Sequence, residues 1–405
     1  MTTAQSFELV VKGGRVFDPA RRIDDIQDIG ISGGKIVRVA RSLDTGKAAR
    51  VVEAGGRLVV PGLIDLHTHV AGSLRKAVGE DAFVEPDVAG VHGGVTTVVD
   101  AGSVGAYTFG GFSRFVIPNA RTRIISFLNA GAVGIFQAPE IRDRASMDVE
   151  STVATIKAHP QVVKGVKFRM VSPAIVDLGL DLPKLAKQMA VEGGVRVMVH
   201  VGDIIADNPK GAELAPKLLS EVLTAGDIVT HTTSHRVGAL LGRDGRLLPE
   251  ALDARKRGVN FDVGHGMANF TFKSARTVLD QGFIPDTLSS DLTVRGRFGP
   301  LKSLTEVMGK FLALGLSLED VIRMTTSNSA RSIGMESELG SLAEGRTADI
   351  SILELHEGKF LFRDNFGGTL EGKIAIAPWR AIRAGQPMPL DHGPHPWGWL
   401  PERAG

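Results

Sequence analysis

Eight apolar, strand-like runs between residues 58 and 291 constrain the fold of this chain most strongly. They are "LVVPGLIDLH", "GVTTVVDAG", "RIISFLNAG", "VVKGVKF", "RVMVHVG", "DIVTHTT", "GVNFDVGHG" and "IPDTLSSD". The segments between them are long, and two of them, Leu182–Gly194 and Leu248–Gly258, have helical patterns that end in glycine. Strands that alternate with helices and stay apolar along their length are typical of a parallel sheet buried on both faces. The pattern predicts an α/β protein built on a (β/α)8 TIM-like barrel.

The two ends of the chain differ from this middle segment. Short Val/Ile runs with Gly-Gly breaks fill the first part, as in "FELVVKGGRVFDP", and similar runs return from Gly340 to Met388. Such runs are typical of β-hairpins, so we expect both ends to build one small β-sandwich. The tail contains histidines, prolines and tryptophans, and we expect it to pack on the surface or on a second subunit. The expected segments are an N-terminal part of the sandwich (1–56), the barrel (57–337), a C-terminal part of the sandwich (338–388) and the extended tail (389–405).

Composition excludes several classes of function. The chain has 47 basic and 45 acidic residues and a net charge of +2, and no dense Lys/Arg run indicates a nucleic-acid partner. It has no cysteine, so any metal must be bound by nitrogen and oxygen ligands. No signal peptide is recognisable, and no apolar run approaches the roughly 20 residues of a membrane span. We expect a cytoplasmic homo-oligomer that acts on a small molecule.

Polar residues gather where the predicted strands end. His67 and His69 follow the first strand, and residues i and i+2 of a strand share a face, so both imidazoles can point to one place. The carboxyl ends of the strands of a barrel converge on one mouth, where active sites form. Each histidine alone could be a core or solvated residue, but the set together fits the nitrogen and oxygen ligands of zinc and similar ions. The other strand-end residues are Lys167, His200, His231, His265 and Asp291.

Lys167 needs a separate explanation, because an ammonium group repels a metal ion. If burial removes its proton, the amine can capture carbon dioxide, and the resulting carbamate could bridge two metals. Lys164 has the opposite strand parity and would face the helices or solvent. The alternative is that Lys167 is an exposed lysine at the end of a strand.

The motif "VVPGLIDLHTH", together with the strand-end lysine, histidines and aspartate, resembles the amidohydrolase superfamily over nearly the whole chain. "GVTTVVDAGS", "GVKFRM", "GVNFDVGHGM" and "PDTLSSDL" resemble its deacetylase-like members, which include acetyl-mandelate-type ester hydrolases and are often labelled dihydroorotase-like. The resemblance implies two zinc ions at the barrel mouth and an N6-carboxylysine at Lys167 that bridges them. His67, His69 and Asp291 would hold one ion, and His200 and His231 the other.

Two neighbouring subfamilies fit less well. A dihydroorotase would resemble HxHxR, but Ala71 occupies the position of that arginine. A hydantoinase would have a tyrosine soon after the bridging lysine, but the only tyrosine is Tyr107. His235, in "HTTSHRVG", is an extra histidine in a loop where the deacetylase-like members would have a Cys or similar residue followed by an aromatic. It could line the pocket or only cap the loop.

These features predict a binuclear zinc-dependent hydrolase that cleaves an ester or amide of a small, carboxylate-bearing substrate with a metal-bridging hydroxide. Asp291 would carry the proton to the leaving group. Arg169 would pair with the substrate carboxylate, or only support the site through an ion pair. His265 would contact the substrate, or be a core histidine. The alternatives for the whole chain are a cyclic amide hydrolase, which Ala71 disfavours, and a non-catalytic binding protein, which the filled ligand positions disfavour.

Overall fold

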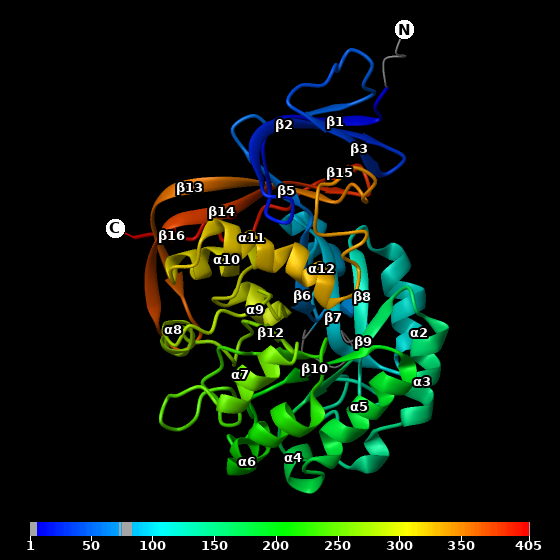
Figure 1. The fold of residues 1–405 in the computed structure, drawn as a ribbon, viewed down its shortest axis with the longest axis vertical. Helices are drawn as coiled ribbons and strands as arrows, with labels where there is room; N and C mark the ends of the chain where they lie inside the picture. Colours follow the sequence, from blue (N-terminus) through cyan, green and yellow to red (C-terminus); the bar gives the residue numbers. More distant parts are fainter. Residues whose placement is uncertain (1–5, 73, 75–82, 405) are drawn as a thin grey trace.

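The computed structural model of the protein describes residues 6–72, 74 and 83–404. The outer bounds expected for the N-terminal segment and the tail, Met1 and Gly405, lie outside these residues. Figure 1 shows two parts, a barrel of strands and helices and a sheet that both ends of the chain build at one end of the barrel. The predicted α/β barrel with an accessory domain made from the terminal segments is confirmed.

The barrel sheet contains seven parallel strands that follow one another in chain order. Each pairs with the next, as expected for strands joined by helical crossovers. Each of these strands is a short apolar segment that is buried along almost its whole length. They are β6 (Leu63–Thr68), β7 (Val95–Gly105), β8 (Arg123–Asn129), β9 (Val163–Arg169), β10 (Arg196–His200), β11 (Ile228–Thr230) and β12 (Asn260–Asp262).

The segment 287–292 takes the place of the eighth strand and closes the barrel. On one side Val263 N donates to Thr287 O over 3.0 Å, and on the other Asp291 N donates to His67 O over 2.6 Å. The segment forms only isolated bridges with its neighbours. Asp291 has a φ of 54°, which interrupts the extended backbone that a longer strand needs.

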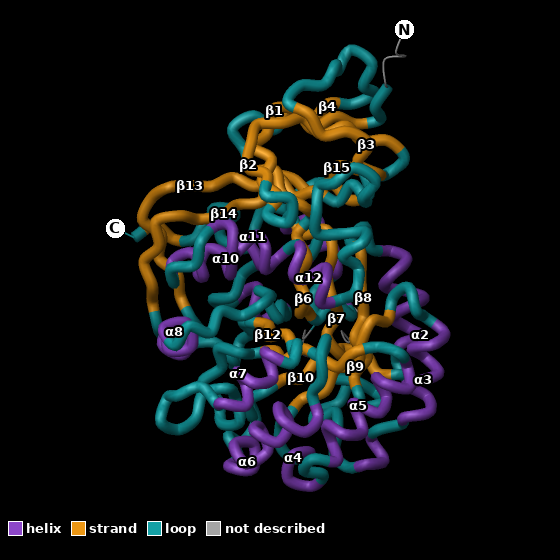
Figure 2. Tube along the Cα trace, in the orientation of Figure 1, coloured by secondary structure: helices purple, strands orange, loops and turns teal. Residues whose placement is uncertain are grey.

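Helices surround the barrel strands, as Figure 2 shows. The two helical patterns recognised in the sequence appear as α5 and α7, and Gly194 ends α5 with a φ of 71°. The helices are α1 (Pro86–Ala89), α2 (Phe109–Gly111), α3 (Val149–Ala158), α4 (Ala174–Asp177), α5 (Asp181–Gly193), α6 (Pro209–Lys217), α7 (Pro249–Lys256), α8 (Phe272–Asp280), α9 (Val294–Phe298), α10 (Leu304–Ala313), α11 (Leu318–Thr325) and α12 (Ser327–Ser332).

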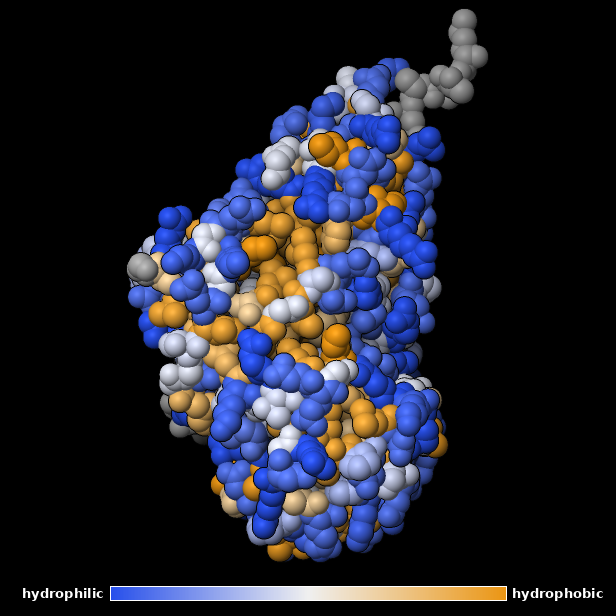
Figure 3. All heavy atoms as spheres, turned by 60° about the vertical axis from the view of Figure 1, so that its left-hand side comes forward, coloured by the Kyte–Doolittle hydropathy of each residue, from blue (hydrophilic) through white to orange (hydrophobic). Residues whose placement is uncertain are grey.

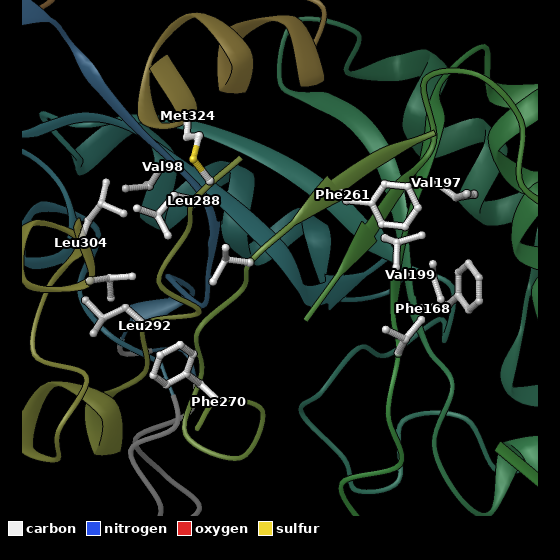
Figure 4. Close-up of a cluster of buried hydrophobic side chains, with 14 of the residues drawn as sticks. Val98, Phe168, Val197, Val199, Phe261, Phe270, Leu288, Leu292, Leu304 and Met324 are labelled. Carbon is white, nitrogen blue, oxygen red and sulfur yellow. The ribbon is translucent and has the colours of Figure 1, made fainter. Parts of the chain in front are cut away.

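Alternate strand residues build two apolar layers. Figure 4 shows the outer layer, in which strand residues such as Val98 and Phe168 belong to one cluster with Met324 of α11. The inner layer fills the barrel, and Ala330 of α12 joins it. Because this packing fills one end of the barrel interior, a site can form only at the other end, where the strands finish.

The terminal segments form one nine-stranded mixed sheet with the order β15-β14-β13-β5-β1-β2-β3. In addition, β4 pairs with β1 and β16 pairs with β13. The sheet has an apolar cluster of its own, separate from the barrel core. Its strands are β1 (Leu9–Asp18), β2 (Ile23–Ser32), β3 (Lys35–Ala40), β4 (Val51–Glu53), β5 (Leu58–Pro61), β13 (Ile350–Arg363), β14 (Thr369–Arg383), β15 (Gln386–Met388) and β16 (Glu402–Arg403).

The border between the two parts lies at Gly62 rather than after residue 56. β5 pairs with β13 in the terminal sheet, and the barrel begins with β6. The run "LVVPGLIDLH" looks like one strand because both halves are buried. A side chain at Gly62 would clash, since its Cβ would lie 2.2 Å from Thr96 Oγ1. The chain can therefore pass from one sheet to the other only through a glycine.

The tail lies along the barrel of its own chain. Arg297 Nη2 is 2.5 Å from Asp391 Oδ2, and His395 Nε2 is 2.6 Å from Glu306 Oε2. Figure 3 shows apolar side chains on the face between the terminal sheet and the barrel. Apolar surface of this kind is common where subunits meet, and the expected homo-oligomer stays a prediction. Among the described residues, no helix is long and apolar enough to cross a membrane.

Candidate metal centre

His67, His69 and Asp291 form a compact group at the mouth of the barrel. Each offers one ligand atom, and these atoms lie within 4.8 Å of one another. Asp291 Oδ1 is 3.1 Å from His69 Nε2 and 3.4 Å from His67 Nε2. The two histidines come from the end of β6 and the aspartate from the closing segment, so barrel closure brings the three together. Nitrogen and carboxylate oxygen donors at this spacing suit a divalent ion such as zinc.

Lys167 lies inside the barrel beside this group. Its Nζ is 2.9 Å from His67 Nε2, and the side chain is buried. Burial lowers the pKa of Lys167 to about 8, although the nearby Asp291 carboxylate raises it. Lys164 faces the other way and donates to Pro160 O over 2.7 Å. The two lysines therefore lie on the opposite faces that strand parity predicts.

His200 and His231 complete the cluster from the ends of β10 and β11. Their ring centroids are 4.1 Å apart, and the His231 ring is 5.1 Å from that of His67. His231 has a φ of 71°, a costly backbone conformation for a residue with a side chain. The structure thus brings together every ligand expected from the sequence: His67, His69, Lys167, His200, His231 and Asp291.

The hydrogen bonds of these histidines leave nitrogen lone pairs free in the cluster. His231 Nδ1 is 2.6 Å from Gly264 O, and His200 Nε2 is 3.0 Å from Gly202 O. A carbonyl only accepts, so the bonded nitrogen carries the hydrogen and the other nitrogen has a lone pair. His231 Nε2 is buried and has no hydrogen-bond partner. A buried lone pair without a donor is what a metal ligand requires, so the residues fit the implied ions.

The Thr230 hydroxyl and the Asp262 carboxylate hold His67 in the tautomer that carries its hydrogen on Nδ1. Thr230 Oγ1 donates to Asp262 Oδ2 over 2.7 Å, so it can accept from His67 Nδ1, 3.0 Å away. His67 Nε2 then carries the lone pair that faces the cluster. Thr287 and Ser289 also donate to Asp262, whose pKa burial raises to about 6. The sequence motifs did not predict this support, although Asp262 and Thr230 lie at the ends of two predicted strands.

Three histidines of the cluster, His67, His200 and His231, are held neutral. Burial and nearby positive charge, including Lys167, lower the pKa of His67 and His200 well below the ordinary value. The pKa of His231 falls to about 4, mainly because of burial, although the Asp291 carboxylate opposes the shift. Neutral imidazole is the form that binds metals, so these groups need not lose a proton first.

The cluster opens into a pocket of about 200 Å³. Apart from the expected ligands, its lining combines apolar residues with four polar ones, as in many small-molecule sites. These lining residues are Ala101, Asn129, Ile135, Arg169, Ile204, Met267, Ala268, Asn269 and Thr293.

Arg169 lines the pocket, but two of its nitrogens are already engaged. Nε donates to Glu140 Oε1 over 2.5 Å, and Nη2 donates to Glu140 Oε2. Glu140 is buried in the connection between β8 and α3, and its proximity to Arg169 lowers its pKa against the effect of burial. The supporting ion pair, which was the alternative to carboxylate binding by Arg169, is therefore present. Its acidic member had no recognisable signal in the sequence.

His265 and His235 lie away from the pocket. His265 is fully buried, its Nε2 is 3.1 Å from Lys310 Nζ, and its ring stacks on Phe270 with centroids 4.0 Å apart. It is absent from the pocket lining, so it has the core position that was the alternative to substrate contact. The His235 ring packs against Phe366 at 4.6 Å and borders a separate hollow.

Comparison with known proteins identifies the family. The model of the amidohydrolase family matches residues 58–379, and the chain belongs to this family. A deacetylase from Brucella anthropi is 31% identical over 365 residues, which cover 88% of this chain and 87% of that protein. The crystal structure of an adenine deaminase has a TM-score of 0.86 at 28% identity and covers 95% of this chain and 100% of that one. A dihydroorotase crystal structure has a TM-score of 0.82 at 28% identity, covering 95% and 99%.

The protein is therefore a hydrolase of the amidohydrolase superfamily with the barrel fold of its relatives. The resemblance stated from the sequence motifs is confirmed. The activities in the names of the relatives differ, so the substrate has to be argued from the site itself.

Proposed function

We propose that the protein is a binuclear zinc-dependent deacylase that cleaves an ester or amide of a small, carboxylate-bearing substrate. The observation that carries this proposal is that buried histidines converge on Lys167 and Asp291. One of their nitrogens, His231 Nε2, is left with a free lone pair. The deacetylase among the relatives supports an acyl group as the part removed.

In this proposal His67, His69 and Asp291 would hold one ion, and His200 and His231 would hold the other. Lys167, once carboxylated by carbon dioxide, would add carbamate oxygens as further ligands. When bound, two such ions supply hydroxide at neutral pH and polarise the carbonyl of the substrate. The buried position of Lys167 supports this role, because it leaves the amine beside His67 and away from solvent.

The chain itself supplies proton transfer, orientation and exclusion of water. Asp291 lines the pocket beside His69, so it can take a proton from the attacking water and give it to the leaving group. Arg169 Nη1 has no hydrogen bond to a described residue, and it can still donate to a substrate carboxylate while its other nitrogens hold Glu140. The apolar wall, which includes Ile135 and Met267, would enclose the acyl group.

A cyclic amide hydrolase is the second candidate, because a dihydroorotase has closely similar structure. Two positions disfavour it. Ala71 is buried and offers no cation for a cyclic substrate's carboxylate. Tyr107 is 64% exposed and donates to Asp148 Oδ2 over 2.7 Å, outside the pocket lining, so it cannot replace the tyrosine of hydantoinases.

The test is a substrate screen with protein prepared in zinc and bicarbonate. N-acyl amino acids, O-acetylated 2-hydroxy acids and cyclic imides are compared by kcat/KM, with metal content measured on the same sample. We expect close to two zinc ions per chain and turnover of one of the acyclic classes. One ion or less in active protein would contradict the binuclear mechanism, and turnover of cyclic imides alone would favour the second candidate.

A further inference from the structure

Two asparagines line the pocket, and they differ sharply in their hydrogen bonds. Asn129 is satisfied at both ends, because its Nδ2 donates to Gly102 O over 2.9 Å and its Oδ1 accepts from Gly131 N over 2.8 Å. Asn269 is 2% exposed, and its Oδ1 is buried with no hydrogen-bond partner. Buried polar atoms are nearly always paired, so Asn129 has a structural role and Asn269 lacks a partner that a ligand could supply.

The backbone around Asn269 is firmly held. Gly266 N donates to Ser290 O over 2.9 Å, and Gly266 O accepts from Asn365 Nδ2 over 3.1 Å. Ala268 O accepts from Arg236 Nε over 3.2 Å. The loop that carries Asn269 is therefore fixed to the closing segment, to the β13–β14 connection and to the loop after β11. The scaffold therefore sets the backbone position of Asn269 in the wall, and its soft terminal torsion can adjust to a ligand.

Asn269 lies beside the expected proton carrier. A Cβ at Gly266 would lie 2.3 Å from Asp291 Oδ2 and 3.3 Å from Asn269 Nδ2, so the NH2 end of the carboxamide lies toward the Asp291 carboxylate, and a turn of the soft terminal torsion would bring Oδ1 to that side. Any substrate atom that receives a proton from Asp291 is thus near the Asn269 carboxamide. An amide nitrogen at that point carries a hydrogen that needs an acceptor, whereas an ester oxygen carries none.

We propose that Asn269 determines specificity by accepting a hydrogen bond through Oδ1 from the N–H of a scissile amide, so that the substrate is an N-acyl amine. This inference rests on the proposed deacylase function and makes its substrate class narrower. Water adds its oxygen to the acyl carbon, and the C–N electron pair stays on nitrogen. One water proton passes through Asp291 to that nitrogen, and a carboxylic acid and an amine leave.

The test uses inhibitors that differ in one atom. A methylphosphonyl group linked to the α-position of propanoic acid through NH, O or CH2 gives isosteres of N-acetylalanine, and calorimetry measures their affinity for zinc-loaded protein. Losing the partner of a buried polar group predicts that the NH compound binds the wild type about 5- to 150-fold more tightly than the O compound. Asn269→Leu keeps the number and branching of the side-chain heavy atoms and should make the NH and O compounds bind almost equally.

Met267→Leu is the matched control, because it changes the same wall without removing a polar group and should keep the preference for NH. Zinc content and circular dichroism show whether each variant remains folded. Equal binding of the NH and O compounds to the wild type would overturn the inference. An equal loss for both compounds in Asn269→Leu would also overturn it, because it would indicate a contact to atoms that they share. If none of the compounds bound zinc-loaded wild type, the proposed function would fall as well.

Discussion

Arg169 and Glu140 form a buried ion pair in the wall of the pocket, with Nε of the arginine 2.5 Å from Oε1 of the glutamate. Arg169 follows the expected bridging lysine by two residues, so its place at the mouth could be predicted from strand parity. Glu140 lies in a loop that is distant from Arg169 in the sequence, so no local sequence pattern could predict their contact. Because of this ion pair, substituting Arg169 alone would alter the stability of the protein as well as any binding of a substrate carboxylate.

Arg169→Met alone should destabilise the protein strongly. It would leave the Glu140 carboxylate buried without its cation, and breaking one side of a buried pair costs about 3–5 kcal/mol. Replacing both residues, as Arg169→Met with Glu140→Leu, removes the unpaired charge and should restore most of the free energy of unfolding. Urea denaturation of the wild type, both single variants and the double variant measures this coupling. If the effects of the two single substitutions simply added up in the double variant, the residues would not act as a pair.

The double variant also allows a clean test of carboxylate binding. A charge-assisted pair between Arg169 Nη1 and the substrate carboxylate contributes about 1.5–3 kcal/mol. We therefore expect kcat/KM to fall roughly 10- to 150-fold for carboxylate-bearing substrates. It should change little for the matching methyl esters or amides, and zinc content should stay constant. Equal losses on charged and neutral substrates would mean that Arg169 only supports the metal centre.

Lys167→Ala should abolish activity and reduce zinc content, because it removes the expected bridge between the two ions. Short carboxylic acids added to the variant should restore part of the activity by taking the place of the carbamate. Lys164→Ala is the matched control three residues away on the opposite face of the strand, and it should be nearly silent because Lys164 donates to the exposed Pro160 carbonyl. Loss of activity in Lys164→Ala with a silent Lys167→Ala would contradict the assignment.

Thr230→Val should weaken zinc binding without changing any ligand. The substitution removes the hydroxyl that links His67 Nδ1 to Asp262, so the imidazole is no longer held with Nε2 free. Loss of such a supporting partner typically costs about 10- to 100-fold in metal affinity. Competition with a chromogenic chelator measures the change. Thr232→Val removes a neighbouring hydroxyl bond to the Asp262 carbonyl and should leave zinc affinity unaltered; an equal effect in both variants would contradict the role of Thr230.

The sequence was most informative where apolar strands stop at polar residues. His67, His69, Lys167, His200 and His231 could be placed because each lies at or near the end of a buried run whose direction the barrel dictates. Long-range partners could not be foreseen, since Glu140 and Lys310 come from a loop and a helix whose position depends on tertiary packing. The border at Gly62 was missed for a related reason, because two buried strands of different sheets have the same apolar composition.

Because Lys310 is buried, we expect the stability of the protein to depend on pH in an unusual way. It is fully buried in α10, where its Nζ donates to Pro300 O over 2.7 Å and lies 3.1 Å from His265 Nε2. Burial lowers its pKa to about 8, while the charges of Glu306 and Asp364 oppose this shift. The unfolded chain, with an ordinary lysine pKa, therefore binds more protons than the folded protein between about pH 8 and 10.5, and stability from this group rises with pH in that window.

Comparison with Lys310→Met isolates this contribution, because most other titrating groups are common to both proteins. The free energy of unfolding of the wild type, relative to the variant, should increase by about 2 kcal/mol between pH 7 and 9.5. Urea unfolding at both pH values measures the difference. Lys164→Met, which removes a lysine whose Nζ donates to the exposed Pro160 carbonyl, serves as the control and should show almost no change. A constant difference between wild type and Lys310→Met would mean that Lys310 keeps an ordinary pKa in the folded protein.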